Sequence, residues 1–252
     1  MKKLGLFGLF FAVACSSGTT TTPKVDGGAT DAGADVPANS FVQTGRVVDY
    51  DSAKGVKNVT VTATLSTGPI TTTTDDTGKY SLAVPKNTPY TMSLTADKYL
   101  KLNEQEWSLT ADATRGDTKF VSAATQGLLQ AFLTGYDDTL AVVSVGFIKL
   151  PTCTASLDGM TVALENPGKA QVVYFVPGHL TPDGTSVTDG ASPAVIFYNV
   201  TPNAPVKPVL SNTTCKLAAF PQTDPTVPTI SYTGNVVAEA GKAASFGRFF
   251  LE

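Results

Sequence analysis

Residues 59–65 read Val-Thr-Val-Thr-Ala-Thr-Leu, an unbroken alternation of apolar and hydroxyl side chains. Successive side chains of a strand point to opposite faces, so the apolar residues share one face. Thr60, Thr62 and Thr64 share the other face, which we expect to be largely solvated. A second alternating stretch follows the turn sequence Asp-Asp-Thr-Gly at residues 75–78, where aspartate can accept backbone hydrogen bonds and glycine can take positive φ. The segment therefore predicts half-buried strands joined by a tight turn.

The composition of the 252-residue chain favours the same fold class. Threonine occurs 37 times, nearly as often as all charged side chains together, and charged residues make up only 15% of the chain. Few charges, many β-branched residues and abundant Gly and Pro argue against a helical bundle. A net charge of −3 argues against nucleic-acid binding. The presence of a single histidine argues against most zinc sites and catalytic triads. We expect an all-β protein that has no nucleic-acid partner.

The N-terminus has the features of an export signal. Lys2 and Lys3 precede an uncharged, largely apolar stretch that is too short to span a bilayer. The stretch ends in Ala12-Val13-Ala14-Cys15, which resembles the lipobox of bacterial lipoproteins. The resemblance implies that residues 1–14 are a lipoprotein signal peptide and that Cys15 is lipidated. Ordinary signal-peptidase cleavage near Ala14 is the alternative, because Ala12-x-Ala14 also fits that rule.

Residues 15–40 combine the lipidated cysteine with a tether rich in Gly, Ala, Thr and Asp, which has almost nothing to bury and is expected to be disordered. No second apolar span appears, so the lipid would be the only membrane anchor. Ser16 and Ser17 follow Cys15 without an aspartate retention signal, which by analogy with lipoproteins implies the outer membrane.

Residues 41–110 carry a second resemblance. The residues that support it are, in order, Gly45-Arg46-Val47, Gly55, Val59, Val61, Thr74, Asp75, Gly78, Tyr80, Leu82, Val84, Pro85, Tyr90, Leu94 and Ala96. This order resembles a carboxypeptidase regulatory-like domain over about residues 43–109. The resemblance implies a small Greek-key β-sandwich, transthyretin-like in topology and often grouped with carbohydrate-binding-like folds. It also implies a module without catalytic residues of its own.

Residues 111–139 are expected to be a linker that contains one helix. Apolar residues at positions 121, 124, 128, 129, 132 and 133 have the spacing of a helix with one buried face. Ser122 is a candidate N-cap. We expect this helix to pack against one of the flanking domains.

Residues 140–252 resemble a second, divergent copy of the same sandwich. Met160, Val162 and Leu164 alternate as Val59, Val61 and Leu65 do, and an insertion occupies residues 177–193. The predicted fold is thus two small Greek-key β-sandwiches, transthyretin-like or Ig-like, joined by one short helix and sharing their strand order. Tyr80 and Phe197 fall on inward positions and are expected in the two cores.

The three cysteines favour one disulfide. If Cys15 carries lipid, Cys153 and Cys215 remain, and export to an oxidising compartment favours their pairing. A metal site is the alternative, but two cysteines with only His179 available make a poor ligand set. We expect neither a metal nor a cofactor.

Few residues are candidates for catalysis. His179 lies in a Pro/Gly-rich loop without a nucleophile elbow or an orienting partner. The acidic pairs Asp49/Asp51, Asp75/Asp76 and Asp137/Asp138 could bind Ca²⁺, but none matches an EF-hand loop, and turn roles explain them more simply. The sequence therefore predicts no catalytic residues, and we expect that the protein is not an enzyme.

Exposed aromatic side chains would favour a sugar site. Trp107, the only tryptophan, and Tyr99, next to a turn, are the candidate ligand-binding residues. The sequence predicts a non-catalytic envelope lipoprotein that binds or scaffolds at the cell surface, with a glycan or an envelope protein as partner. The alternative is a carbohydrate-binding module for glycan or peptidoglycan.

Overall fold

The structure, a computed structural model, describes residues 37–174, 184–189, 194–241 and 243–252. The expectations for the signal peptide, for Cys15, for nearly all of the tether and for His179 fall outside these residues. Within them, no helix has the length and apolar character needed to cross a membrane.

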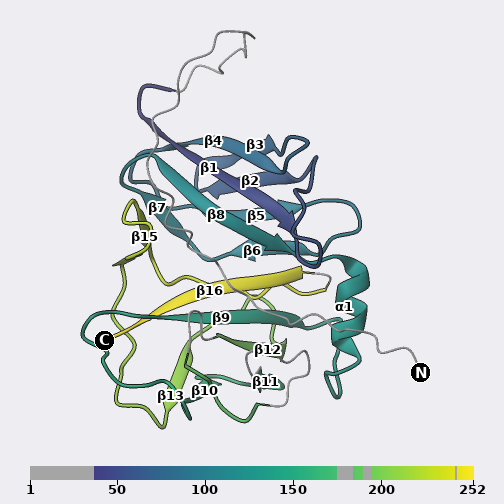
Figure 1. Cartoon of the computed structure of the whole chain (residues 1–252), viewed down its shortest axis with the longest axis vertical. Helices are drawn as coiled ribbons and strands as arrows, with labels where there is room; N and C mark the ends of the chain where they lie inside the picture. Colours follow the sequence, from purple (N-terminus) through teal and green to yellow (C-terminus); the bar gives the residue numbers. More distant parts are fainter. Residues whose placement is uncertain (1–36, 175–183, 190–193, 242) are drawn as a thin grey trace.

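The all-β fold with one short helix is confirmed (Figure 1). The first sandwich contains β1 (Ser40–Asp49), β2 (Thr60–Leu65), β3 (Gly68–Thr73), β4 (Lys79–Pro85), β5 (Thr91–Thr95), β6 (Lys101–Glu104), β7 (Trp107–Leu109) and β8 (Ala113–Phe120). The helix α1 (Ala123–Gln130) follows. The second sandwich contains β9 (Ala141–Lys149), β10 (Thr161–Leu164), β11 (Gln171–Tyr174), β12 (Ala194–Val200), β13 (Pro208–Ser211) and β16 (Ala243–Leu251). Between β13 and β16, β14 (Gln222–Thr223) and β15 (Ile230–Tyr232) form a small sheet with β7.

The two sandwiches share the pairing pattern that the sequence predicts. In the first, β1 pairs antiparallel with β4 and parallel with β8, while β2 pairs antiparallel with β5. In the second, β9 pairs antiparallel with β12 and parallel with β16, while β10 pairs antiparallel with β13. The match does not extend to the other strands: β3 pairs with β2 whereas β11 pairs with β12, and β5 pairs with β6 whereas β13, among the described residues, has only β10 as a neighbour.

The alternating residues occupy the positions expected of them. Val59, Val61 and Leu65 are buried in the first core, and Met160, Val162 and Leu164 are buried in the second. Tyr80 and Phe197 are also core residues. The threonines of β2 point to the outer face, where they are half-buried or exposed. The pattern of period two therefore sets the buried face in both sandwiches.

One eight-stranded sheet, ordered β11-β12-β9-β16-β6-β5-β2-β3, runs through both sandwiches. Its middle strand, β16, pairs parallel with β6 of the first sandwich and with β9 of the second. In Figure 1, β9 and β16 cross the middle of the molecule between the two sandwiches. The sheet makes the two halves one structure.

This arrangement changes the expected domain boundaries. The predicted linker, residues 111–139, begins with β8, which belongs to the first sandwich because it pairs with β1. The predicted second domain, residues 140–252, contributes β15 to the first sandwich, where β15 pairs with β7. Neither 41–110 nor 140–252 is therefore a self-contained unit.

The helix is shorter than expected and packs differently. Its N-cap is confirmed, because the backbone N–H of Thr125 donates to the Ser122 hydroxyl at 3.1 Å. The expected buried apolar face is wrong for Ala124, which is exposed, and for Phe132, which follows the helix and is 45% exposed. The buried side chain of the first turns is instead Thr125, whose hydroxyl donates to Asp51. In the first turns of the helix, this polar contact to the first sandwich replaces the expected apolar one.

Tyr174 takes the place of a missing strand beside β10. Its hydroxyl accepts from the backbone N–H of Val162 at 2.8 Å and donates to the carbonyl of the same residue at 3.1 Å. In the first sandwich, β3 occupies the corresponding edge of β2. One buried side chain thus satisfies the backbone groups that β11 leaves unpaired.

We expect Tyr174→Phe to lower the free energy of unfolding by about 1–3 kcal/mol, because it leaves a buried N–H and a buried C=O without partners. Chemical denaturation measures the change. Tyr198→Phe is the matched control. It removes a hydroxyl that bonds to the Thr134 carbonyl and the Gln171 amide oxygen, and these two groups are only partly buried. Equal stability of Tyr174→Phe and the wild type would contradict the role assigned to this hydroxyl.

Candidate functional site

The junction between the sandwiches is the candidate functional element, because strands from the C-terminal part of the chain complete both cores. Along β16, Phe249 and Leu251 lie in the second core, whereas Phe250 points to the opposite face and lies in the first. On β15, Tyr232 lies opposite Trp107 of β7. A strand that fills two cores at once fixes the two sandwiches to each other.

Polar contacts reinforce the junction at its surface. The Lys101 ammonium lies 2.7 Å from the Glu239 carboxylate, and the Asn103 amide donates to the same carboxylate at 2.7 Å. Lys101 and Asn103 belong to β6 of the first sandwich, while Glu239 precedes β16. These side chains are partly exposed, so each contributes little by itself.

Trp107 does not present a surface to a sugar. Its side chain is 1% exposed and lies edge-on to the rings of Tyr90 and Tyr232, at centroid distances of 5.7 and 5.6 Å. The Arg115 guanidinium covers its face at 4.6 Å. The expectation of a ligand-binding Trp107 is therefore wrong, because the partner strand β15 buries the indole.

Tyr99 is half-buried, and one of its faces is occupied. Its ring stacks on Phe120 with a centroid distance of 4.7 Å and an interplanar angle of 6°. Its hydroxyl donates to the Asp49 carboxylate at 3.1 Å. Partial burial, and then this hydrogen bond, raise the pKa of Tyr99. A ligand-binding role for Tyr99 stays a prediction, and Tyr99 does not lie with Trp107 in one aromatic surface.

A buried ion pair lies at the centre of the first sandwich. The Arg115 guanidinium is 2.8 Å from the Glu104 carboxylate, and the two side chains are only 10% and 3% exposed. Burial lowers the pKa of Arg115, but the charge of Glu104 outweighs this effect and raises it. No spacing in the sequence signals this pair, because its members lie on strands β6 and β8 that are brought together only by the fold.

Tyrosines and Gln43 surround this ion pair with hydrogen bonds. The fully buried Gln43 donates to the Tyr80 hydroxyl at 3.1 Å and accepts from the Tyr90 hydroxyl. Burial raises the pKa of Tyr80 and of Tyr90. The Gln43 amide thus provides a buried hydrogen-bond partner for both tyrosine hydroxyls.

The acidic pairs serve in turns. The Asp75 carboxylate accepts from the N–H of Thr77 at 2.8 Å and of Lys79 at 2.9 Å, while Gly78 takes a φ of +81°. The Asp137 carboxylate accepts from the N–H of Thr139 at 2.9 Å. Among the residues that the structure describes, no three His, Cys, Asp or Glu side chains come together as metal ligands.

These turn carboxylates predict a pH dependence of stability. Hydrogen bonds from Thr77 lower the pKa of Asp75, those from Thr139 lower the pKa of Asp137, and the Leu157 N–H lowers the pKa of Asp189. A carboxylate with a lowered pKa stabilises the fold above its unfolded pKa, about 3.9, and the stabilisation is lost as pH falls through the folded value. We expect the Tm to be level from pH 7 to pH 5 and to fall below about pH 4. Thermal melts would show this, and Asp75→Asn would melt with a shallower fall. A Tm that rises on acidification would contradict it.

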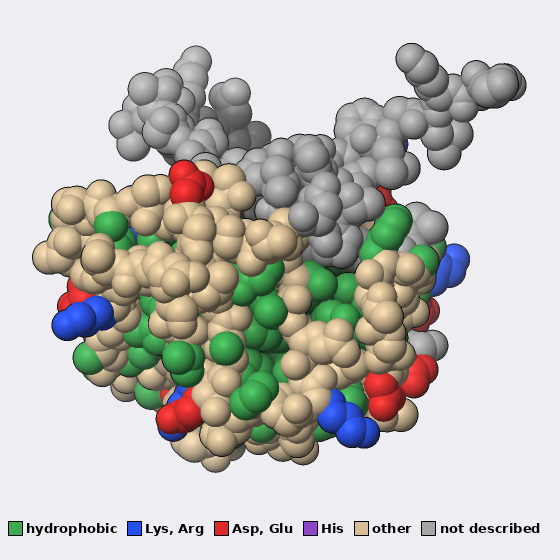
Figure 2. All heavy atoms as spheres, turned by 90° about the horizontal axis from the view of Figure 1, so that it is seen from below, with side chains coloured by type: hydrophobic (Ala, Val, Ile, Leu, Met, Phe, Trp, Pro, Cys, Tyr) green, Lys and Arg blue, Asp and Glu red, His purple; other side chains and the backbone are tan. Residues whose placement is uncertain are grey.

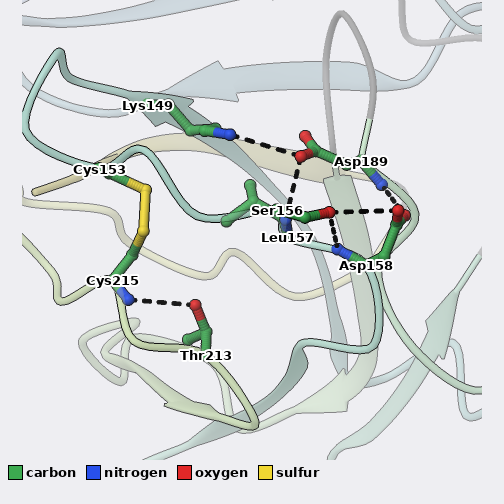
Figure 3. The surroundings of a disulfide bond; sticks show 8 residues. All are labelled: Lys149, Cys153, Ser156, Leu157, Asp158, Asp189, Thr213 and Cys215. Atoms are coloured by element: carbon green, nitrogen blue, oxygen red, sulfur yellow. Dashed lines mark hydrogen bonds and ion pairs between the residues drawn. A yellow bond between two sulfur atoms is a disulfide. The ribbon is translucent and has the colours of Figure 1, made fainter.

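The predicted disulfide is confirmed. Cys153 and Cys215 are joined with an S–S distance of 2.02 Å and a Cα–Cα distance of 5.4 Å (Figure 3). In the same region, the Asp189 carboxylate accepts from the Leu157 N–H at 3.0 Å, and the Asp189 N–H donates to Asp158 at 2.7 Å. The disulfide and these bonds tie the loops of the second sandwich together.

A small apolar hollow lies between β10 and β11, where the two strands do not pair. Its volume is about 90 Å³, and its lining includes Leu164, Pro167, Val172 and Phe197. Figure 2 views the molecule from this end, where hydrophobic side chains gather in the middle and charged ones lie toward the margin. Small-molecule sites usually enclose about 300–1,000 Å³, so this hollow is too small for one.

A comparison with protein-family models finds a match for the first sandwich. Residues 44–121 match the carboxypeptidase regulatory-like domain. This match confirms the resemblance seen in the sequence and extends it through β8, in agreement with the pairing of β8 and β1. A search of curated protein sequences found no match.

Solved structures give weaker likenesses. The Bacillus anthracis TIE protein is 11% identical with a TM-score of 0.29, and the likeness covers 84% of this chain but only 34% of that protein. The shaft pilin SpaA from Lactobacillus rhamnosus GG is 12% identical with a TM-score of 0.26, over 84% of this chain and 98% of the pilin. Likenesses at this level carry no argument about function.

Proposed function

We propose that this chain is a non-catalytic binding or scaffolding module of the bacterial cell envelope, held to the outer membrane by a lipid on Cys15. The observation that carries the proposal is the single sheet that unites two sandwiches through β16. A rigid body of this kind presents separate surfaces at a fixed distance, which suits a scaffold. The match of residues 44–121 to the regulatory-like domain supports a role outside catalysis.

The lipid anchor is tested by Cys15→Ser. The variant is expected to move from the membrane fraction to a soluble periplasmic or secreted form, because Cys15 follows the only signal-like apolar stretch of the sequence. Fractionation followed by immunodetection measures this, with Cys153→Ser as a control that retains Cys15. Retention of Cys15→Ser in the detergent phase would contradict lipid anchoring.

The scaffolding role is tested by photo-crosslinking in living cells. A photoreactive residue is placed in turn at Thr71 on β3, at Val209 on β13 and at Phe132 after α1, which are exposed positions on three sides of the structure. We expect one position to form a defined adduct with one envelope component. Absence of adducts from all three positions, in cells that contain the folded protein, would count against the role.

Carbohydrate binding is the second candidate. Its expected residue Trp107 is buried, so aromatic stacking does not support it. A different surface, on the outer face of the first sandwich, supports carbohydrate binding.

A further inference from the structure

Eight hydroxyl side chains form a regular array on the outer face of β2, β3 and β5. We call this array the threonine grid; its members are Thr60, Thr62, Thr64, Thr71, Thr73, Thr91, Ser93 and Thr95. The strand registers align them in rows, since Thr60 lies between Thr73 and Thr95, and Thr62 lies between Thr71 and Ser93. In the third row, Thr64 lies between Pro69 and Thr91.

The grid is periodic in two directions. Neighbouring strands are about 4.8 Å apart, and side chains on one face recur about every 6.6–6.8 Å along a strand. The hydroxyls of a row therefore repeat at nearly the length of one pyranose unit in an extended glycan. The opposite face of the same strands is apolar and buried, which fixes the grid on the outside.

The hydroxyls of the grid are not used within the protein. In the part of the chain that the structure describes, none of the eight makes a side-chain hydrogen bond, whereas Thr74, at the end of the same region, bonds to Val59 and to Val56. Thr64, Thr71, Thr73 and Thr95 are exposed, and the other members are half-buried. Each hydroxyl is thus free to donate and to accept outside the molecule.

The grid is also uncharged. The three strands contain no ionisable side chain. At the margins of the grid, Lys101 of β6 pairs with Glu239, and Lys57 lies 3.8 Å from Asp76. Strands that carry no cations themselves, with the lysines at their margins paired to carboxylates, offer little electrostatic attraction to nucleic acid, anionic lipid or acidic polymers. A neutral polymer that carries hydroxyl groups does not need such attraction, because it can bind through hydrogen bonds alone.

From this geometry we infer that the threonine grid binds a neutral, hydroxyl-rich polysaccharide laid across the strands. Its hydroxyl groups exchange hydrogen bonds with the rows of the grid, and the threonine methyl groups contact the C–H faces of the sugar rings. The inference names a ligand class for the binding role proposed above and rests on it. Because each hydrogen bond replaces one to water, binding comes from many weak contacts in register.

Co-sedimentation of the full chain with insoluble polymers tests the inference. The probes are microcrystalline cellulose and chitin, with calcium alginate as the anionic comparison. Thr60→Val/Thr62→Val/Thr64→Val removes the three hydroxyls of β2, the middle strand of the grid. It keeps β-branched side chains, which suit a strand. The matched control is Thr152→Val/Thr154→Val/Thr185→Val, which makes the same chemical change at exposed threonines elsewhere.

The wild type is expected to sediment with a neutral polymer but not with alginate. The grid variant should bind about tenfold more weakly, as three lost hydrogen bonds would predict, and the control should bind as the wild type does. Near-UV circular dichroism confirms that both variants are folded.

Three results would overturn the inference: no binding to either neutral polymer, a grid variant that binds as tightly as the wild type, or equal loss in both variants. If the polymers fail but the photo-crosslinking above gives a defined adduct at Val209 or Phe132, which lie outside the grid, only the grid is wrong and the scaffolding role stands. If both fail, the proposed function fails with it.

Discussion

A fragment limited to residues 37–121 is expected to show no cooperative unfolding transition, although it contains the whole segment that matches the regulatory-like domain. The missing part of the chain supplies Ile230, Tyr232 and Phe250 to the first core. Deleting a single large core side chain costs about 3–5 kcal/mol. Losing several exceeds the lower end of the stability of typical domains, about 5 kcal/mol.

Differential scanning calorimetry and near-UV circular dichroism of the fragment measure this expectation. The full chain carrying Tyr232→Ala is the companion variant, which should stay folded but melt at a lower temperature. A fragment with a sharp melt and fixed aromatic signals would show that the first sandwich is independent of β15 and β16.

Glu104→Ala is expected to lower the free energy of unfolding by about 3–5 kcal/mol, because it leaves the buried Arg115 guanidinium without its counter-ion. Arg115 lies over the Trp107 ring and its side chain is only 10% exposed, so the unpaired charge would stay largely shielded from bulk water. The melting temperature should fall, and the aromatic circular dichroism signal of Trp107 should weaken.

The double variant Glu104→Leu/Arg115→Met provides the control. It removes both charges, and replacing a buried ion pair by apolar residues of similar volume is often neutral or stabilising. We therefore expect the double variant to be more stable than Glu104→Ala. A double variant as unstable as the single one would show that packing around Glu104, and not the unpaired charge, sets the cost.

Local patterns predicted the strands well, because each strand has one buried face. The alternation in residues 59–65 and at Met160, Val162 and Leu164 gave the correct buried side chains, and the Ser122 cap of the helix was also correct. The disulfide followed from cysteine number and compartment. Each of these features depends on neighbours in the sequence or on a simple count.

Features that depend on distant pairing were not predicted. Trp107 was a candidate ligand-binding residue, and its burial was not predicted because the strand that covers it, β15, lies more than 120 residues further along the chain. The pairing of β6 with β16 is equally non-local. Glu104 and Arg115 are closer in the sequence, but they lie on two strands, β6 and β8, whose spacing follows no helix or strand period. The apolar spacing after Ser122 suggested a buried helix face, but the first turns are held by polar contacts instead.

The position of β16 also bears on how the chain reaches its native state. A chain made or threaded through a membrane from its N-terminus presents β1 to β8 long before β16 emerges, so neither core can close until residues 243–251 are available. Contacts between such distant residues give a high contact order, which slows folding. The strands of the first sandwich therefore wait for β15 and β16, the last strands of the chain, before their core is complete.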